Sequence, residues 1–203
     1  MDGQGYATAL GLSTAVGLRP FVILAVSAML MHFGVIHPSH AFAWMGATGV
    51  TDVFIALAVV ELLADKIPVV DHVLHTSHLA IAPIAAALVA GAALPNGTPD
   101  GSAYTVMGLG ALNALGVRTA SSSVRVASTG LTFGVANPVL SFIEDICTAL
   151  LALAAFLVPI VAIAAGVLCL VAAVLFVRSG RGLWGRALRK KSAVHARGST
   201  GSP

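Results

Sequence analysis

The fold is decided by the stretch VELLADKIPVVD, residues 60–71, in which an apolar helix is predicted to run into three carboxylates, one lysine and a proline. The whole chain holds only eight acidic residues, so three of them in this one stretch form a marked cluster. A second acidic pair, Glu144-Asp145, lies inside another apolar part of the chain. Charged side chains are costly inside a bilayer and are kept where they are paired, hydrated or used. The two groups therefore indicate a membrane protein with a polar site.

The composition supports lipid as the solvent. Hydrophobic residues make up 58% of the 203 residues and charged residues 9%, with a mean hydropathy of +0.95. Soluble domains carry about 25% charged residues. About six membrane spans of ~20 residues with short loops would use nearly all of this length. We therefore predict an all-α, polytopic membrane protein, a compact bundle of about six transmembrane helices in residues 1–178, followed by a basic, disordered tail in residues 179–203.

The positions of the predicted helices follow from the apolar segments and from the prolines. Pro20, Pro68 and Pro138 are predicted to break or begin helices, because proline lacks a backbone N–H and restricts the residue before it. Two halves of three spans in opposite orientations, as in transporters with inverted repeats, remain an open alternative. The predicted spans are 11–33, 42–63, 77–93, 104–117, and two helices within 138–177 that fold back near Leu157-Val158-Pro159.

The basic residues predict the orientation. Seven of the eleven lysines and arginines follow Val177, and the loops predicted at 34–41 and 94–103 contain none. Six alternating spans would place all eleven on one side, as the positive-inside rule requires of the cytoplasmic side. We thus predict a multi-pass protein of the plasma (inner) membrane with both termini cytoplasmic. The charge is explained by topology, so nucleic acid is not an expected partner, and the expected partners are the lipid bilayer, a small ion or solute and, as an open alternative, a second copy of the chain.

The acidic residues form the predicted site. Glu61 and Asp65 are four positions apart and share one helix face, and five carboxylates against two cations give a charge of −3 if all are ionised. Either some carboxylates hold protons, or the site binds a hard divalent or monovalent cation such as Mg²⁺, Ca²⁺, Mn²⁺ or Na⁺. The alternative is a set of salt bridges that fix helix packing. The predicted ion-binding residues are Glu61, Asp65, Asp71, Asn137, Glu144 and Asp145, with Arg19 and Lys66 as counter-charges.

Two further polar segments are predicted on the same side. His72, His75 and His78 would share one face of a helix, where they could bind a metal or titrate near neutral pH, or simply form a polar interface. The segment from Thr119 to Ser123, between two arginines, is predicted to be a flexible cytoplasmic loop.

Three motifs carry a family resemblance. They are GLRPF at residues 17–21, E-x-x-x-D-K-x-P-x-x-D at residues 61–71, and N-P-x-x-S-x-x-E-D at residues 137–145. In these motifs the chain resembles a bacterial membrane family known as domain of unknown function 4126. The resemblance implies no activity.

The polar site within apolar helices predicts a small secondary transporter or channel that uses its carboxylates for protons or a cation. In this hypothesis the protein is not an enzyme. Two alternatives stay open. One is a structural or accessory membrane subunit, and the other is a metal-dependent membrane enzyme that processes lipids.

Overall fold

The computed structural model describes residues 3–64, 68–132 and 135–157, together with 164, 168 and 171, and for residues 68–76 it describes the helical backbone alone. Every regular element in these ranges is helical, which confirms the predicted all-α class for this part of the chain. The elements are α1 (Gly3–Leu18), α2 (Pro20–His32), the 3-10 helix η1 (His40–Gly46), α3 (Thr48–Ala64), α4 (Pro68–Ala93), α5 (Asp100–Thr132) and α6 (Asn137–Leu157).

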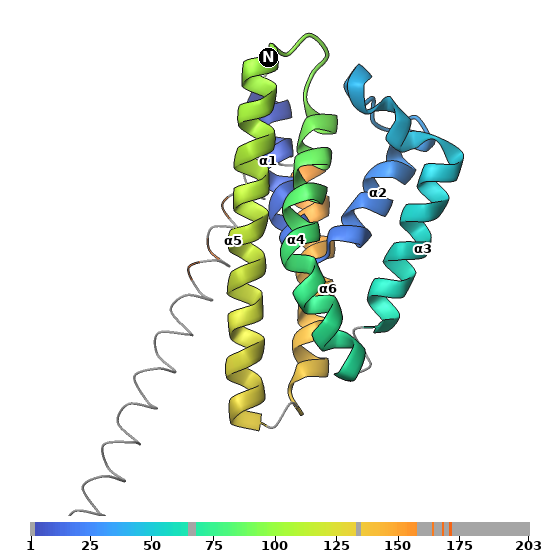
Figure 1. Cartoon of the computed structure of the whole chain (residues 1–203). Coiled ribbons are helices and arrows are strands. Elements are labelled where there is room, and N and C mark those ends of the chain that lie inside the picture. The colour runs from blue at the N-terminus through green and yellow to red at the C-terminus, as the bar shows by residue number, and fades with distance from the viewer. Residues whose placement is uncertain are drawn as a thin grey trace, which may run out of the picture.

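The predicted span at residues 11–33 is wrong, because this segment forms two helices. Arg19 has φ −136° and ψ 83°, outside the helical region, and Pro20 is the first residue of α2. Proline displaces the preceding residue from the α conformation and cannot donate an i to i−4 hydrogen bond, so the chain turns at this point. Figure 1 shows α1 running from the end marked N to about the middle of the molecule and α2 returning toward the same end.

The four helices that follow run alternately between the two ends of the molecule (Figure 1). η1 precedes α3 with a bend of 65° between them. Pro68 is the first residue of α4 and Pro138 the second of α6, whereas α4 continues through Pro83. The predicted second crossing within residues 138–177 and the basic tail lie almost entirely outside the described residues.

The predicted end of a span at Val117, with a loop after it, is also wrong. α5 is continuous over 33 residues, about 50 Å at 1.5 Å per residue. The polar side chains that suggested a loop bond back to their own helix. Thr119 Oγ1 donates to the Leu115 carbonyl at 2.7 Å, and Ser123 Oγ donates to the Thr119 carbonyl at 2.8 Å. Such bonds to the preceding turn let serine and threonine continue a helix.

α1 lies at the centre of the helix packing, where it contacts α4, α5 and α6. Gly17, in its last turn, allows the closest approach to α5. A Cβ added there would lie 2.7 Å from the Val117 Cβ and 2.8 Å from the Ala114 carbonyl oxygen. Small residues at helix contacts let backbones come this close. The close contact fixes the end of α1 against α5, which positions the site described below.

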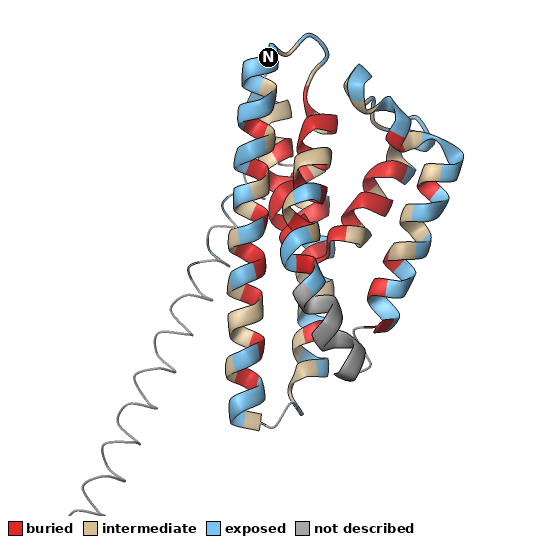
Figure 2. Ribbon diagram, viewed as in Figure 1, coloured by how far each residue is buried: buried red, intermediate tan, exposed pale blue. Residues whose placement is uncertain are grey.

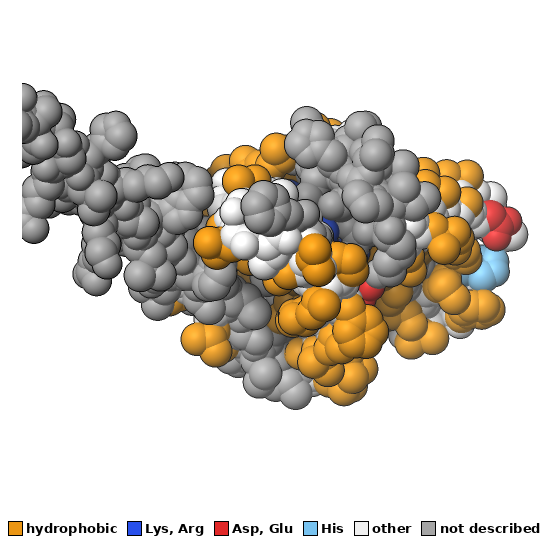
Figure 3. All heavy atoms as spheres, turned by 90° about the horizontal axis from the view of Figure 1, so that it is seen from below, with side chains coloured by type: hydrophobic (Ala, Val, Ile, Leu, Met, Phe, Trp, Pro, Cys, Tyr) orange, Lys and Arg blue, Asp and Glu red, His pale blue; other side chains and the backbone are white. Residues whose placement is uncertain are grey.

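Several charged side chains are buried inside the apolar core, and many large apolar side chains are exposed. Arg118 and Glu61 are fully buried, whereas Leu63 and Leu112 have 64% and 67% of their surface exposed. Figure 2 shows exposed positions along the outer faces of the helices, and in Figure 3 hydrophobic side chains cover much of the described surface seen from below. Soluble proteins almost never bury arginine or glutamate fully unless the group is paired, as it is here, and they rarely expose large apolar patches.

Within the described residues, α6 is the single helix long and apolar enough to cross a bilayer by itself, and the bent pair of η1 and α3 passes the same test together.

Candidate charged site at the helix break

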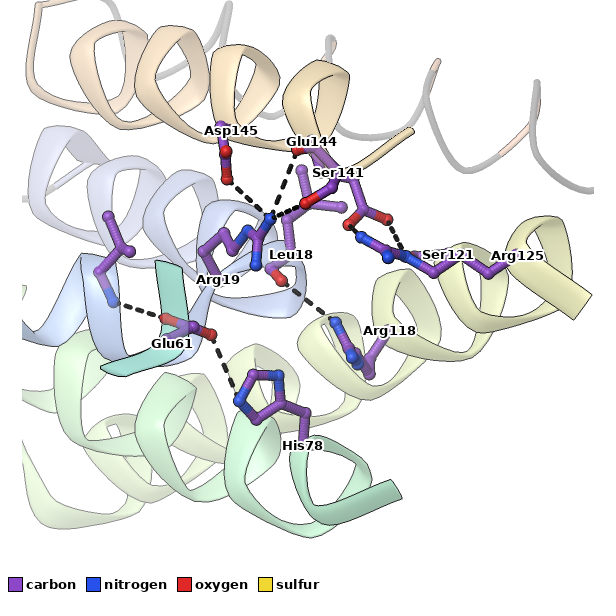
Figure 4. A network of polar contacts seen from close by, with 11 residues as sticks. Leu18, Arg19, Glu61, His78, Arg118, Ser121, Arg125, Ser141, Glu144 and Asp145 are labelled. Carbon is purple, nitrogen blue, oxygen red and sulfur yellow. Dashed lines mark hydrogen bonds and ion pairs between the residues drawn. The ribbon is translucent and has the colours of Figure 1, made fainter. Parts of the chain in front are cut away.

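The break between α1 and α2 leaves two helix ends inside the molecule. The last carbonyls of a helix and its first N–H groups lack partners within the helix, and they carry partial negative and positive charge respectively. Arg118 Nη1 of α5 donates to the Leu18 carbonyl of α1 at 3.2 Å. Glu61 Oε2 of α3 accepts a hydrogen bond from the Val22 N–H of α2 at 3.0 Å. A cation thus meets the negative end and an anion meets the positive end (Figure 4).

Glu61 also joins α2 and α3 to α4. Its Oε1 lies 3.3 Å from Nε2 of His78, and both side chains are almost completely buried. The His78 ring makes an edge contact with the Phe21 ring, with 5.8 Å between the centroids. A carboxylate and an imidazole at this distance can share a proton, so the pair can exist as an ion pair or as two neutral groups.

Arg19, in the break itself, is held by α6. Its Nη2 lies 2.7 Å from Oδ1 of Asp145 and donates to Ser141 Oγ at 2.9 Å. The same nitrogen lies 3.4 Å from the Ser141 carbonyl oxygen. Arg19 has only 3% of its surface exposed. These contacts fix the non-helical residue between α1 and α2 to the first turns of α6.

A second charged group, the α5–α6 clamp, consists of Ser121, Arg125 and Glu144. The Arg125 guanidinium donates to both carboxylate oxygens of Glu144, to Oε1 from Nε at 3.5 Å and to Oε2 from Nη2. The Ser121 hydroxyl donates to Oε1 of the same carboxylate. Paired bonds of this kind are among the stronger polar contacts in proteins. Glu144 and Asp145 are neighbours in sequence but point in different directions from α6, so Glu144 contacts α5 and Asp145 contacts Arg19 in the break.

The charges of the described cluster balance. Three arginines, Arg19, Arg118 and Arg125, face three carboxylates, so the sum is zero with His78 neutral. The predicted charge of −3 left out Arg118 and Arg125, and it counted Asp65, Lys66 and Asp71, whose side chains lie outside the described residues. Each of the three carboxylates already contacts a cation or histidine. Among the residues described, no group of three histidine, cysteine, aspartate or glutamate side chains could hold a metal ion.

Several predicted site residues cannot be placed. Asn137 is half-buried at the start of α6, and its Nδ2 donates to Thr129 Oγ1 at 3.0 Å. His78 is placed beside Glu61. Outside the described residues, or described by their backbone alone, are Asp65, Lys66, Asp71, His72 and His75.

The sequence reasoning missed the arginines of α5. Arg118, Ser121 and Arg125 are spaced three and four positions apart, and all three are buried on one face of the helix. The same spacing of three or four positions continues to Ser128. This helical spacing of polar residues could have identified a buried helix face from the sequence. Arg118 has a further property that spacing does not reveal. Its Nε and Nη2 are buried and, within the described part of the chain, have no hydrogen-bond partner.

These features define an all-helical protein with a balanced charge cluster around a broken helix. The chain matches the family described as Domain of unknown function (DUF4126) over residues 6–179, and it belongs to that family. No curated protein and no solved structure matches it.

Proposed function

We propose that this protein is a multi-pass protein of the plasma (inner) membrane, in which α1 and α2 form a re-entrant pair and α3 to α6 cross the bilayer. The apolar outer faces of the helices and the buried arginines support this proposal. Non-helical backbone is tolerated at membrane depth only where protein or a water-filled cavity surrounds it. Arg19 meets this condition, since it is buried and the helix ends on both sides of it are capped.

The proposed orientation places the start of α4 toward the cytoplasm. The segments at the other end, residues 33–47 and 94–99, contain no lysine or arginine, as the positive-inside rule expects of the outer side. Because α1 begins at that same end (Figure 1), the N-terminal helix starts on the outer side in this orientation. The proposed orientation differs from the cytoplasmic N-terminus predicted from six alternating spans.

Within this topology we propose that the protein is a small transporter or channel for protons, or for a small ion or solute moved together with them. The observation that carries the proposal is the helix break halfway through the bundle, with a buried cation at one helix end and a buried carboxylate at the other. Transporters use broken helices of this kind to bring backbone dipoles to a substrate near the middle of the membrane.

Glu61 and His78 are the proposed proton-carrying pair. When Glu61 is ionised, its charge attracts the positive end of α2 through the Val22 N–H. When Glu61 takes a proton, that attraction weakens, so the equilibrium shifts toward conformations in which α2 is displaced from α3. Proton uptake and movement of the re-entrant pair would then be coupled, because the proton binds one conformation better than the other.

Proton flux into liposomes tests this proposal. The purified protein is reconstituted, a potassium diffusion potential is applied with valinomycin, and an enclosed pH-sensitive dye reports proton entry. Glu61→Gln should reduce the flux to that of empty liposomes while its size-exclusion profile stays that of the parent. Glutamine can still accept the Val22 N–H bond but cannot be ionised. Equal flux from the parent and the variant would contradict the proposal.

A structural or accessory membrane subunit is the second candidate. It is favoured by the observation that Glu61, Glu144 and Asp145 each contact their own partner. In that case the reconstituted parent would give no flux above empty liposomes, and substitutions in the cluster would reduce folding alone. A metal-dependent lipid-processing enzyme would depend on His72 and His75, whose side chains lie outside the described residues.

A further inference from the structure

Arg118 is the buried cation of the cluster that has no carboxylate partner among the described residues. The other two arginines each pair with a carboxylate of α6, whereas Arg118 donates from Nη1 to the backbone carbonyl of Leu18. Only 1% of the surface of Arg118 is exposed. A guanidinium does not lose its proton in proteins, so this buried charge is permanent.

The remaining edge of the Arg118 guanidinium has the geometry that binds oxyanions. Nε and Nη2 are buried and have no hydrogen-bond partner in the part of the chain that the structure describes. These two nitrogens form one edge of the planar group, and their N–H bonds point in the same direction. That arrangement matches the two oxygens of a carboxylate. Because charged donors without a partner are costly inside a protein, this edge favours an anionic acceptor.

The start of α2 is a second anion-binding group at the same break. The first N–H groups of a helix attract anions, and here the Val22 N–H binds Oε2 of Glu61 at 3.0 Å. Figure 4 shows the Arg118 guanidinium pointing toward the break, where its Nη1 reaches Leu18. Arg118 and Glu61 are close enough to interact electrostatically. The start of α2 thus already holds a carboxylate, and a buried guanidinium is directed at the same place.

A proton added to Glu61 or His78 unbalances the charge at the break. With Glu61 ionised and His78 neutral, three arginines face three carboxylates and the sum is zero. One added proton on either member of the pair gives a sum of +1. The charged or titratable groups around Glu61 in the described residues are Arg19, His78 and Arg118. A net charge at membrane depth is costly, so one monovalent anion bound together with the proton would restore the balance.

We propose that the break binds a small monovalent carboxylate when Glu61 is protonated, and that this is the solute moved together with the proton. Its two oxygens accept from Nε and Nη2 of Arg118, and one of them also takes over the Val22 N–H that Glu61 occupies in this structure. The inference rests on the proposed function. Because both donors of Arg118 are buried, the carboxylate reaches them only when α2 has moved away from α3.

The packing around the break favours a small anion. The end of α1 is fixed against α5 at Gly17, so only the α2 side of the site opens. A proton and a monovalent carboxylate together carry no net charge. Their joint movement therefore follows the concentration gradients, whereas the applied potential drives the proton that moves alone.

The test uses Glu61 and Glu144, the two glutamates of the chain, as reporters. The full-length protein carries an NMR-active carbon isotope at the glutamate side-chain carboxyl, and magic-angle-spinning NMR in lipid bilayers follows the carboxyl chemical shift, which reports protonation. Glu61→Gln assigns the two signals. Sodium formate at fixed pH should raise the protonated fraction of Glu61, because coupled ligands favour each other reciprocally, and should leave the Glu144 signal unchanged. Sodium chloride should act about ten-fold more weakly, because it lacks the second oxygen.

Three variants separate the roles of charge and geometry. Arg118→Gln removes the charge and should abolish the formate effect. Arg118→Lys keeps the charge but not the paired donors, so about ten-fold more formate should be needed. Thr119→Ala is the matched control on α5, because Thr119 is exposed and its hydroxyl bonds to its own helix. It should respond to formate as the parent does. A Glu144 signal at the parent position shows that a variant is folded around the α5–α6 clamp.

Three results would overturn the proposal. In the parent, they are a protonated fraction of Glu61 that formate does not change, and a formate effect no stronger than that of chloride. These two comparisons hold even if every variant fails to fold. The third is an Arg118→Gln protein that keeps the folded Glu144 signal and responds to formate like the parent.

The outcome is separable from that of the transport test. Proton flux that depends on Glu61, without any formate effect, would contradict the carboxylate site and leave proton transport standing. A formate effect in a parent protein that gives no flux would support the carboxylate site and contradict transport.

Discussion

The helix break and the α5–α6 clamp both bury a carboxylate beside an arginine, yet they use these groups differently. In the clamp, Arg125 and Glu144 satisfy each other through paired bonds, and Ser121 adds a third. At the break, Glu61 and Arg118 bind backbone ends of two different helices, and Arg118 keeps two donors without a partner among the described residues. The clamp is therefore typical of an ion pair that stabilises the fold, whereas at the break two nitrogens of Arg118 have hydrogen-bond donors that no described residue accepts.

This contrast predicts which charge substitutions will unfold the protein. A buried ion pair that loses one partner leaves an uncompensated charge, which is strongly destabilising. A carboxylate that caps a helix end can be replaced by a neutral amide that still accepts the same bond.

Glu144→Ala should have the largest effect. It leaves the buried Arg125 guanidinium without its counter-charge, and we expect a loss of about 3–5 kcal/mol in the free energy of unfolding. Thermal and denaturant unfolding in detergent would measure this loss. The control is the double variant Arg125→Met with Glu144→Leu, in which neither charge remains and most of the stability should return. A loss below about 1 kcal/mol in Glu144→Ala would show that the clamp is not structural.

Gly17→Ala tests whether the end of α1 must approach α5 closely. Its methyl group would overlap the Val117 side chain, so we expect a loss of about 1–3 kcal/mol. Gly116→Ala is the matched control within α5, because a Cβ there meets no atom within 4 Å. Glycine to alanine inside a helix should stabilise by about 0.5–1 kcal/mol. Changes of the same sign in the two variants would argue against the close contact.

Ser141→Ala removes one of the bonds that hold Arg19 to α6. Asp145 still pairs with Arg19, so the expected loss is about 1–2 kcal/mol, in the lower part of the range for a bond to a charged group. Ser123→Ala serves as the control, because its hydroxyl bonds only to its own helix. If both variants unfold at the same temperature, the Ser141 contact does not contribute to stability.

Glu61→Gln should have the smallest effect on stability, below about 1 kcal/mol, because the amide oxygen can accept the Val22 N–H bond. Glu61→Ala should lose about 1–3 kcal/mol, since it leaves that buried N–H unpaired. Unfolding of the two variants side by side measures the capping role of the side chain. Equal losses would mean that Glu61 stabilises the fold through its charge and not through the cap.

The sequence predicted the helical class and the family, and it singled out Glu61, Glu144 and Asp145, which the structure shows as buried or partly buried acids with partners. It did not predict that α1 and α2 double back. Hydropathy detects an apolar segment but not whether its two halves are collinear. Pro20 at a first helical turn is compatible with a second helix that continues in the same direction and with one that turns back. It also failed at α5, because Ser/Thr-rich composition outweighed the helical spacing of Arg118, Ser121 and Arg125. Partners such as Glu61 and Val22 are 39 positions apart, a pairing that follows only from tertiary packing.

The central claim is that Glu61 at the helix break serves function while the clamp serves the fold. The most direct measurement is proton flux per folded molecule in liposomes, for Glu61→Gln and for the charge-free clamp variant, Arg125→Met with Glu144→Leu. We expect Glu61→Gln to be stable and to give no flux above empty liposomes, whereas the clamp variant should conduct protons like the parent. Flux retained in Glu61→Gln and lost in the clamp variant would contradict it.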